Sequence, residues 1–320
     1  MKKSNKSLSD RDSKLLDISI IIPIYNEEEN TEELYSRLSD VLKKLKKSYE
    51  ILCVDDGSTD KSYQILKEIH QKDKRIKIIK FSRNFGHHTA LTAGLNHCRG
   101  ETVVMMDADL QDRPEDIPLL LQKTEQGYDI AYALREKHQS TFINKTTSKI
   151  FYKMLNKLTH VDVTQNAGTF RVMKRNVVDT LNKLNEASRF MPGLIDWTGF
   201  KKIGIGVDRN ARSEGRKKYN FWKRLKLAVT ATTSFSHFPV QIAGYIGFAV
   251  AGISFIYGIY IIIRKIFFGI PIAGYASLTL SILFFAGIQL IVLGFLGEYI
   301  GKIFKEVQNR PLYIIEEIIE

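Results

Sequence analysis

Residues 103–118 read VVMMDADLQDRPEDIP, in which four apolar residues lead directly into a run of carboxylates. The apolar run is typical of a strand buried within a sheet. Asp107 and Asp109 stand two positions apart at its end, so in an extended chain both side chains lie on the same side. One interpretation is a solvated acidic turn before the next helix, and the other is a binding site for a cation. This stretch alone does not decide between them.

Short apolar runs alternate with segments of helical spacing on either side of this stretch. The apolar runs are ISIIIPI (18–24), YEILCVDD (49–56), RIKIIKFS (75–82), ETVVMMDAD (101–109) and YDIAYAL (128–134). Such alternation predicts an α/β fold with a mainly parallel, Rossmann-like sheet covered by helices. Ligands of these sheets bind outside the carboxyl ends of the strands. Asp107 and Asp109 are predicted to stand at such an end.

The first two predicted strands end in polar motifs on the same edge, PIYNEEE (23–29) and VDDGSTD (54–60). A turn between strand and helix explains Gly57 and the helix-capping side chains that follow it. The turn does not explain why both Asp55 and Asp56 stand at the strand end. A carboxylate at this place can accept hydrogen bonds from a nucleotide base or a ribose hydroxyl.

Two apolar blocks without charged residues, 240–263 and 272–297, lie near the end of the sequence. Each exceeds the ~20 helical residues that cross a bilayer core. We interpret residues 239–297 as a transmembrane hairpin, since a pair of buried helices in a soluble core rarely runs this long without charge. Basic residues flank the open end of the hairpin, which predicts a multi-pass cell-membrane protein with both termini in the cytosol.

The remaining segments have distinct compositions. Residues 1–16 are polar, lack the apolar middle of a secretory signal, and are predicted to form a flexible cytosolic tail. Residues 220–238 mix aromatic with basic residues and predict an amphipathic helix in the membrane interface, with an ordinary linker helix as the alternative. Residues 298–320 are predicted to form a cytosolic C-terminal tail. The net charge of +12 suits anionic partners, but the basic residues flank membrane blocks, which argues against nucleic acid.

Taken together, the motifs PIYNEEE, VDDGS and MDADLQD resemble the family 2 glycosyltransferases, which have the GT-A fold. The segments RNFGHHTALTAG (83–94), RSEGRKKY (212–219) and GEYIGKIFKEVQNRP (297–311), with the two apolar blocks, look like the polyprenyl-phosphate branch of that family. That branch includes the bactoprenol glucosyltransferases and dolichyl-phosphate mannose synthase. The resemblance covers nearly the whole chain and implies a GT-A catalytic domain over residues 17–219.

The resemblance implies an inverting enzyme that moves a sugar, by our expectation a hexose from a UDP-sugar, onto undecaprenyl phosphate at the cytosolic membrane face. It also implies a divalent cation, Mg²⁺ or Mn²⁺, and a homo-oligomer packed through the hairpin. The acceptor, as a phosphate monoester with a second pKa of about 6, is already an oxyanion at neutral pH. A strong catalytic base is therefore optional, and we predict a single displacement.

The resemblance implies site residues one by one. The catalytic set is Asp107, Asp109, Arg212 and Lys218, and the metal ligands are Asp107, Asp109 and Gln111. The binding set is Pro23, Tyr25 and Glu27 in the first loop, Asp55 and Asp56 at the base and ribose, Asp107, Ala108, Asp109 and Gln111 at the diphosphate, Arg135 near the donor, and Arg212 and Lys218 on phosphate groups.

The sequence departs from the family pattern at two places, which leaves the identity of the sugar open. Lys217 stands where relatives have Ser or Thr, and Asn166 and Thr169 stand where relatives often have acids. Two other functions remain as alternatives. A processive polysaccharide synthase is expected to carry a Q-x-x-R-W motif and more spans, and a non-catalytic membrane scaffold is expected to have an altered D-x-D.

Overall fold

The computed structural model describes residues 16–135, 167–184, 186, 189–207 and 274–320, with isolated positions between 249 and 267. The chain divides into two compact units. One is a sheet unit that includes residues 311–320. The other includes residues 218–310. The predicted tail before residue 16 and the predicted interfacial helix at 220–238 lie outside the described residues.

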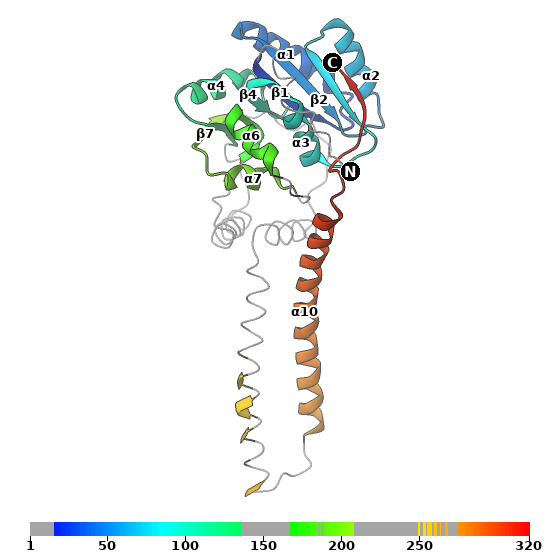
Figure 1. Ribbon diagram of the computed structural model, residues 1–320, viewed down its shortest axis with the longest axis vertical. Helices are drawn as coiled ribbons and strands as arrows, with labels where there is room; N and C mark the ends of the chain where they lie inside the picture. The colour runs from blue at the N-terminus through cyan, green and yellow to red at the C-terminus, as the bar shows by residue number, and fades with distance from the viewer. Residues whose placement is uncertain are drawn as a thin grey trace, which may run out of the picture. The chain divides into compact units, whose positions relative to one another are not determined.

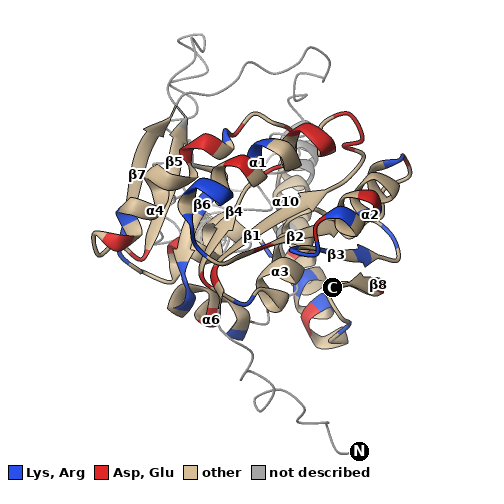
Figure 2. Cartoon of the chain, turned by 90° about the horizontal axis from the view of Figure 1, so that it is seen from above, with Lys and Arg blue, Asp and Glu red and all other residues tan. Residues whose placement is uncertain are grey.

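The sheet of the described chain lies among helices (Figure 1), and its strand order is β7-β5-β6-β4-β1-β2-β3-β8 (Figure 2). Parallel pairs join β1 to β2 and β4, β2 to β3, and β5 to β7. Antiparallel pairs join β6 to β4 and β5, and β8 to β3. The predicted α/β fold with a mostly parallel sheet is confirmed. The strands are β1 (Leu16–Ile24), β2 (Tyr49–Asp55), β3 (Ile76–Phe81), β4 (Gly100–Met105), β5 (Ile130–Arg135), β6 (Ala167–Lys174), β7 (Lys202–Val207) and β8 (Ile315–Ile319).

Helices cover both faces of the sheet, which explains why the central strands are continuously apolar. On one face, side chains of α1, α2 and α4 pack with Ile20 and Ile22 of β1. On the other face, α3 lies so close to β1 that a Cβ on Gly94 would meet the Ile21 side chain at 2.2 Å. The helices are α1 (Thr31–Leu45), α2 (Ser62–Lys72), α3 (His87–His97), the short 3-10 helix η1 (Pro114–Asp116), α4 (Ile117–Glu125), α6 (Arg175–Lys183) and α7 (Met191–Trp197).

The charges of α1 follow its dipole. Glu32 and Glu33 lie in its first turn, and Lys43 and Lys44 lie in its last. Acidic groups at the start of a helix and basic groups at its end each stabilise it by about 0.3–1 kcal/mol.

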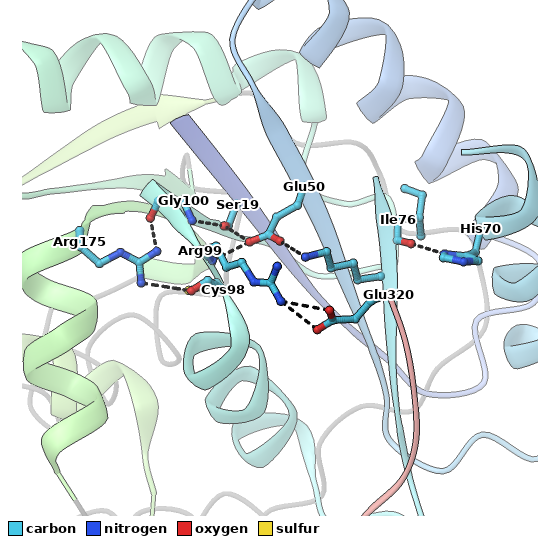
Figure 3. Close-up of polar contacts among 10 residues, drawn as sticks. Ser19, Glu50, His70, Ile76, Cys98, Arg99, Gly100, Arg175 and Glu320 are labelled. Carbon is cyan, nitrogen blue, oxygen red and sulfur yellow. Dashed lines mark hydrogen bonds and ion pairs between the residues drawn. The ribbon is translucent and has the colours of Figure 1, made fainter. Parts of the chain in front are cut away.

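A buried carboxylate links the strands at their amino ends (Figure 3). Glu50, which is 1% exposed, accepts hydrogen bonds from Ser19 Oγ and from the backbone N–H of Arg99, both at 2.6 Å. Its other oxygen lies 2.8 Å from Lys77 Nζ, and the Gly100 N–H donates to Ser19 Oγ at 2.7 Å. A buried carboxylate needs such partners, because desolvation otherwise disfavours its charge. This end of the sheet therefore holds polar residues with a structural role.

The prediction that residues 298–320 form a tail was wrong. Helix α10 (Tyr275–Gln308) continues through Gln308, and β8 then adds an antiparallel strand to the edge of β3. The Tyr313 ring stacks on Phe81 with centroids 5.0 Å apart, and Lys80 Nζ pairs with Glu316 at 2.9 Å. A five-residue edge strand with exposed acids has little apolar pattern, so its sequence does not reveal the partner strand far back in the chain.

Among the described residues, one helix is long and apolar enough to cross a membrane by length and composition. This is Phe284–Gln308, 25 residues of α10 whose most apolar window has no part buried within the protein. The helix extends past residue 297, where the sequence pattern predicted the second span to end. The first apolar block, 240–263, is described at scattered positions only. The predicted pair of transmembrane helices is therefore not confirmed.

Candidate active site

The loops after β1 and β2 hold each other through side chains. The Asn26 N–H donates to Ser58 Oγ at 3.1 Å, and its own side-chain oxygen accepts the Thr59 N–H at 2.8 Å. The Glu28 N–H donates to the Asp60 carboxylate at 3.2 Å. Several polar residues of the PIYNEEE and VDDGSTD motifs thus serve to join two neighbouring loops at the carboxyl edge of the sheet.

The three predicted residues of the first loop lie in different environments. Pro23 is buried within β1, whereas the Tyr25 side chain is 45% exposed. Glu27 lies in the loop before α1, where its carboxylate accepts a hydrogen bond from Asn30 Nδ2 at 2.6 Å and its carbonyl accepts the Thr31 hydroxyl at 2.6 Å. Of the three, Tyr25 presents the largest free surface at this edge.

Asp55 and Asp56 are both buried, and their surroundings differ. Asp56 accepts the backbone N–H of Phe85 at 2.6 Å and that of Gly86 at 2.9 Å. Asp55 Oδ1 accepts the Ser58 N–H at 3.2 Å, while its Oδ2 has no hydrogen-bond partner among the described residues. Burial raises the pKa of both carboxyls. Asp56 thus holds the loop between β3 and α3, and Asp55 keeps one acceptor oxygen without a donor.

Asp107 and Asp109 follow β4 at the same edge, and both are half-buried. The chain turns at Leu110, whose φ is 55°. Gln111 then donates to both oxygens of Asp109, from its backbone N–H at 3.2 Å and from its side-chain amide at 2.5 Å. Asp107 Oδ1 lies 3.4 Å from Nε2 of His87, the first residue of α3. The Asp109 carboxylate is therefore oriented by Gln111, and the Asp107 carboxylate has the His87 ring as a neighbour.

These residues fit a divalent cation of the kind that shares its ligands with a substrate. Mg²⁺ is commonly held by one or two carboxylates together with substrate phosphates and water. Asp107 and Asp109 offer two carboxylates, and the described residues contain no group of three His, Cys, Asp or Glu placed to hold a metal. Gln111 was predicted as a third ligand, and that role stays a prediction. In the structure its amide orients Asp109.

The comparison with protein families decides the class of this chain. Residues 19–181 match the model described as glycosyl transferase family 2. The chain belongs to glycosyl transferase family 2. It is 43% identical over 304 residues to an uncharacterized glycosyltransferase of Synechocystis sp., covering 95% of this chain and 96% of the relative. The predicted enzyme class is confirmed, as is the GT-A type of α/β fold.

Relatives with a more specific name match this family 2 glycosyltransferase over a similar length. The SfII prophage-derived bactoprenol glucosyl transferase of Shigella flexneri is 40% identical over 301 residues, covering 94% of this chain and 97% of the relative. The prophage bactoprenol glucosyl transferase homolog of Escherichia coli K12 is 39% identical over 302 residues, covering 94% and 99%. The predicted resemblance to the bactoprenol glucosyltransferases is confirmed.

The structure describes some of the remaining predicted residues of the glycosyltransferase and not others. Ala108 is buried between the two aspartates, and Arg135 ends β5, where its partner is Val207 of β7. Thr169 lies in β6, with its hydroxyl 3.3 Å from His87 Nε2. Arg212, Lys218 and Asn166 lie outside the described residues.

Sequence reasoning missed His87 and Arg171. The segment RNFGHHTALTAG was recognised as a family motif, but no local signal indicates that its first histidine faces Asp107. Arg171 of β6 is 3% exposed, donates to the Gly168 carbonyl at 2.7 Å, and lies opposite Met105 of β4. Burial lowers the pKa of its guanidinium, and the charges of Asp196 and Asp107 act in the opposite direction. Arg171 is thus a buried cation in the electrostatic field of the site.

Proposed function

We propose that this enzyme transfers a sugar, a hexose from a UDP-sugar, to undecaprenyl phosphate at the cytosolic face of the cell membrane. The observation that carries the proposal is the presence of two carboxylates at the sheet edge, Asp107 and Asp109, in one chain with the long apolar helix Phe284–Gln308. Relatives named bactoprenol glucosyl transferases, which match over nearly their whole length, support a lipid-phosphate acceptor.

On the donor side, Asp107 and Asp109 would hold Mg²⁺ or Mn²⁺, with Gln111 orienting Asp109. When bound, the cation supplies positive charge that stabilises the departing nucleoside diphosphate. The exposed ring of Tyr25 offers a face on which a base can stack, and the free acceptor oxygen of Asp55 suits a hydrogen-bond donor of the nucleotide.

On the acceptor side, the nucleophile needs little activation. A phosphate monoester with a second pKa of about 6 is largely an oxyanion at neutral pH. The protein then has to align two anionic groups and stabilise the leaving group, which we assign to Arg212 and Lys218 together with the metal site. Thr169 puts a hydroxyl, and not a carboxylate, beside the site. This agrees with a single inverting displacement that needs no carboxylate base.

The membrane arrangement belongs to the same proposal. A hairpin at 239–297 and an interfacial helix at 220–238 would keep the catalytic domain at the bilayer surface, where a lipid phosphate arrives. Both termini would be cytosolic, and the chains would form a homo-oligomer through the hairpin.

The test uses the purified full chain in liposomes containing undecaprenyl phosphate, supplied with one labelled UDP-sugar at a time. We expect label in the organic phase as a lipid carrying one sugar, with the anomeric configuration inverted relative to the donor. The matched control is the Asp107→Asn/Asp109→Asn chain, which we expect to be inactive. Label in a water-soluble polymer would indicate a processive synthase instead, and label in neither phase with any UDP-sugar would overturn the proposal.

A further inference from the structure

His87 stands where three separate parts of the sheet unit meet. It is the first residue of α3, and its Nε2 lies 3.4 Å from Asp107 Oδ1, beyond the end of β4. The same nitrogen lies 3.3 Å from Thr169 Oγ1 in β6. The His87 side chain is 43% exposed, and that of Asp107 is 22% exposed. The imidazole therefore lies at the surface of the candidate site, above a more buried carboxylate.

Contacts with neighbouring loop residues fix the backbone just before His87. The Asp56 carboxylate accepts hydrogen bonds from the N–H groups of Phe85 and Gly86. The Thr89 hydroxyl donates to the Phe85 carbonyl at 3.1 Å, which closes the first turn of α3. A Cβ on Gly57 would lie 2.5 Å from the Arg83 carbonyl carbon, so the two loops are in direct backbone contact. The position of His87 is thus set by neighbouring loops and not by its own exposed side chain.

The two adjacent histidines have different surroundings. The His88 ring packs edge-to-face on Phe190 with centroids 5.7 Å apart, and its Nδ1 is buried with no hydrogen-bond partner among the described residues. Burial lowers the pKa of His88 to about 4. His88 therefore packs into the interior as a neutral ring, which leaves His87 as the histidine of this pair that faces the D-x-D motif.

The 3.4 Å between His87 Nε2 and Asp107 Oδ1 is longer than a usual N–H···O hydrogen bond, so the two atoms make a weak polar contact of a kind that can orient a metal ligand. An imidazole N–H can donate to a carboxylate, and a threonine hydroxyl can accept from the same N–H. Contacts of this kind behind or beside a metal-binding carboxylate restrict its rotation, and their loss weakens metal binding by about 10- to 100-fold.

We propose that His87 is a positioning residue for Asp107. Through Nε2 it holds the Asp107 carboxylate in the orientation that receives the divalent cation, and Thr169 fixes the plane of the ring. This inference rests on the proposed function, because it assumes a cation at the D-x-D motif. It assigns a role to the RNFGHH segment that the motif by itself does not reveal.

The test measures Mn²⁺ binding to the full-length protein in detergent, in the presence of UDP, by the loss of the free Mn²⁺ signal in electron paramagnetic resonance. His87→Leu removes the donor, and we expect its Mn²⁺ affinity to fall about tenfold. His87→Gln keeps an N–H donor and should recover most of that affinity. His97→Gln is the matched control at the far end of α3, where the ring nitrogen lies 2.9 Å from the Ala93 carbonyl, and it should bind as the wild type does.

A steady-state measurement separates positioning from a general structural effect. We expect His87→Leu to raise the KM for the metal-bound donor and to leave the KM for the lipid phosphate within twofold. Unchanged Mn²⁺ affinity in His87→Leu would overturn the inference, and so would a His87→Gln chain as weak as His87→Leu. If the wild-type protein itself bound no Mn²⁺ in the presence of UDP, that result would contradict the proposed metal site. It would also overturn this inference, which depends on that site.

Discussion

Asp56 Oδ2 accepts the backbone N–H of Gly86 at 2.9 Å, so the end of β2 holds the loop that leads into α3. A second contact joins the same loops, because Gly57 has a φ of 70° and its α-carbon faces the backbone of Arg83 and Asn84. The carboxylate of Asp56, the residue next to Gly57, thus accepts hydrogen bonds from backbone N–H groups. This junction determines where the first turn of α3, with His87, lies beside the D-x-D motif.

Replacing Gly57 with Ala should damage this junction. The new Cβ would lie 2.5 Å from a backbone carbon and would sit on a left-handed φ, so we expect a loss of about 2 kcal/mol or more in the free energy of unfolding. Gly127→Ala is the control, since its φ is 95° but nothing lies within 4 Å; it should cost about 1 kcal/mol. Denaturant midpoints measure both, and equal losses would contradict the close approach.

Removing the charge of the D-x-D motif should abolish turnover. We expect Asp107→Asn or Asp109→Asn to lower kcat at least about 100-fold, and a chelator to have the same effect on the wild type until Mg²⁺ or Mn²⁺ is restored. Glu115→Gln, in the 3-10 helix η1 that follows the motif, is the control, because that carboxylate pairs with Arg37 at 2.8 and 2.9 Å. Its activity should stay within twofold. Full activity in the presence of the chelator would contradict a metal-dependent mechanism.

His88 should make the protein sensitive to acid. Burial lowers its pKa from 6.5 to about 4, with the charges of His87 and Arg171 acting in the same direction. The unfolded imidazole takes up a proton near pH 6.5, and the folded one does so only near pH 4. Stability is therefore complete above pH 6.5 and falls by about 3 kcal/mol as the pH approaches 4.

His88→Phe keeps a ring of similar size against Phe190 and cannot take up a proton. Thermal unfolding midpoints measured at intervals between pH 7 and pH 4 should fall less steeply for this variant than for the wild type. Identical slopes would show that another group controls the acid sensitivity.

The ion pair between buried Glu50 and half-buried Lys77 should be strongly coupled. Glu50→Gln leaves the Lys77 ammonium, 15% exposed, without its counter-charge, and we expect a loss of about 3 kcal/mol in the free energy of unfolding. Lys77→Met should cost a similar amount. The double variant should lose less than the sum of the two, because neither charge is then left alone. Strict additivity in this double-mutant cycle would contradict the coupling.

Tyr313 should control the docking of β8. Its ring stacks on Phe81, its hydroxyl accepts a hydrogen bond from Asn96 at 3.0 Å, and the Ser82 N–H donates to the Ile314 carbonyl at 3.0 Å. Tyr313→Ala should weaken the docking by about 1–2 kcal/mol, seen as roughly tenfold faster hydrogen exchange at the Ser82 amide. Tyr313→Phe keeps the stack and should change that exchange less than threefold. Unchanged protection in Tyr313→Ala would argue against this contact.

Short-range patterns predicted most of the sheet unit. The first five predicted strands correspond to β1–β5, since each is a continuous run of apolar residues between turn signals. The strands β6, β7 and β8 were not predicted. Arg171 interrupts the apolar pattern of β6, glycine alternates with isoleucine in β7, and two glutamates interrupt the five residues of β8. These strands depend on partners that lie far away in the sequence, and local composition does not identify such partners.

The same division holds for the candidate site. The motifs placed Asp55, Asp56, Asp107 and Asp109 at one edge of a sheet, because parallel strands separated by helices all end on the same side. They did not show that Asp56 accepts the backbone N–H of Gly86, that Gln111 donates to Asp109, or that His87 faces Asp107.

By itself, then, the amino-acid sequence determined the family, the α/β class and the strand ends that carry carboxylates, since these follow from periodicity and from short motifs. Only the tertiary structure decided which of those carboxylates accept hydrogen bonds from other protein groups. It also decided which histidine lies beside the D-x-D motif. The physical reason is that a hydrogen bond depends on distances of about 3 Å between atoms from separate elements. Those distances are set when helices and strands pack together, and no stretch of local sequence records them.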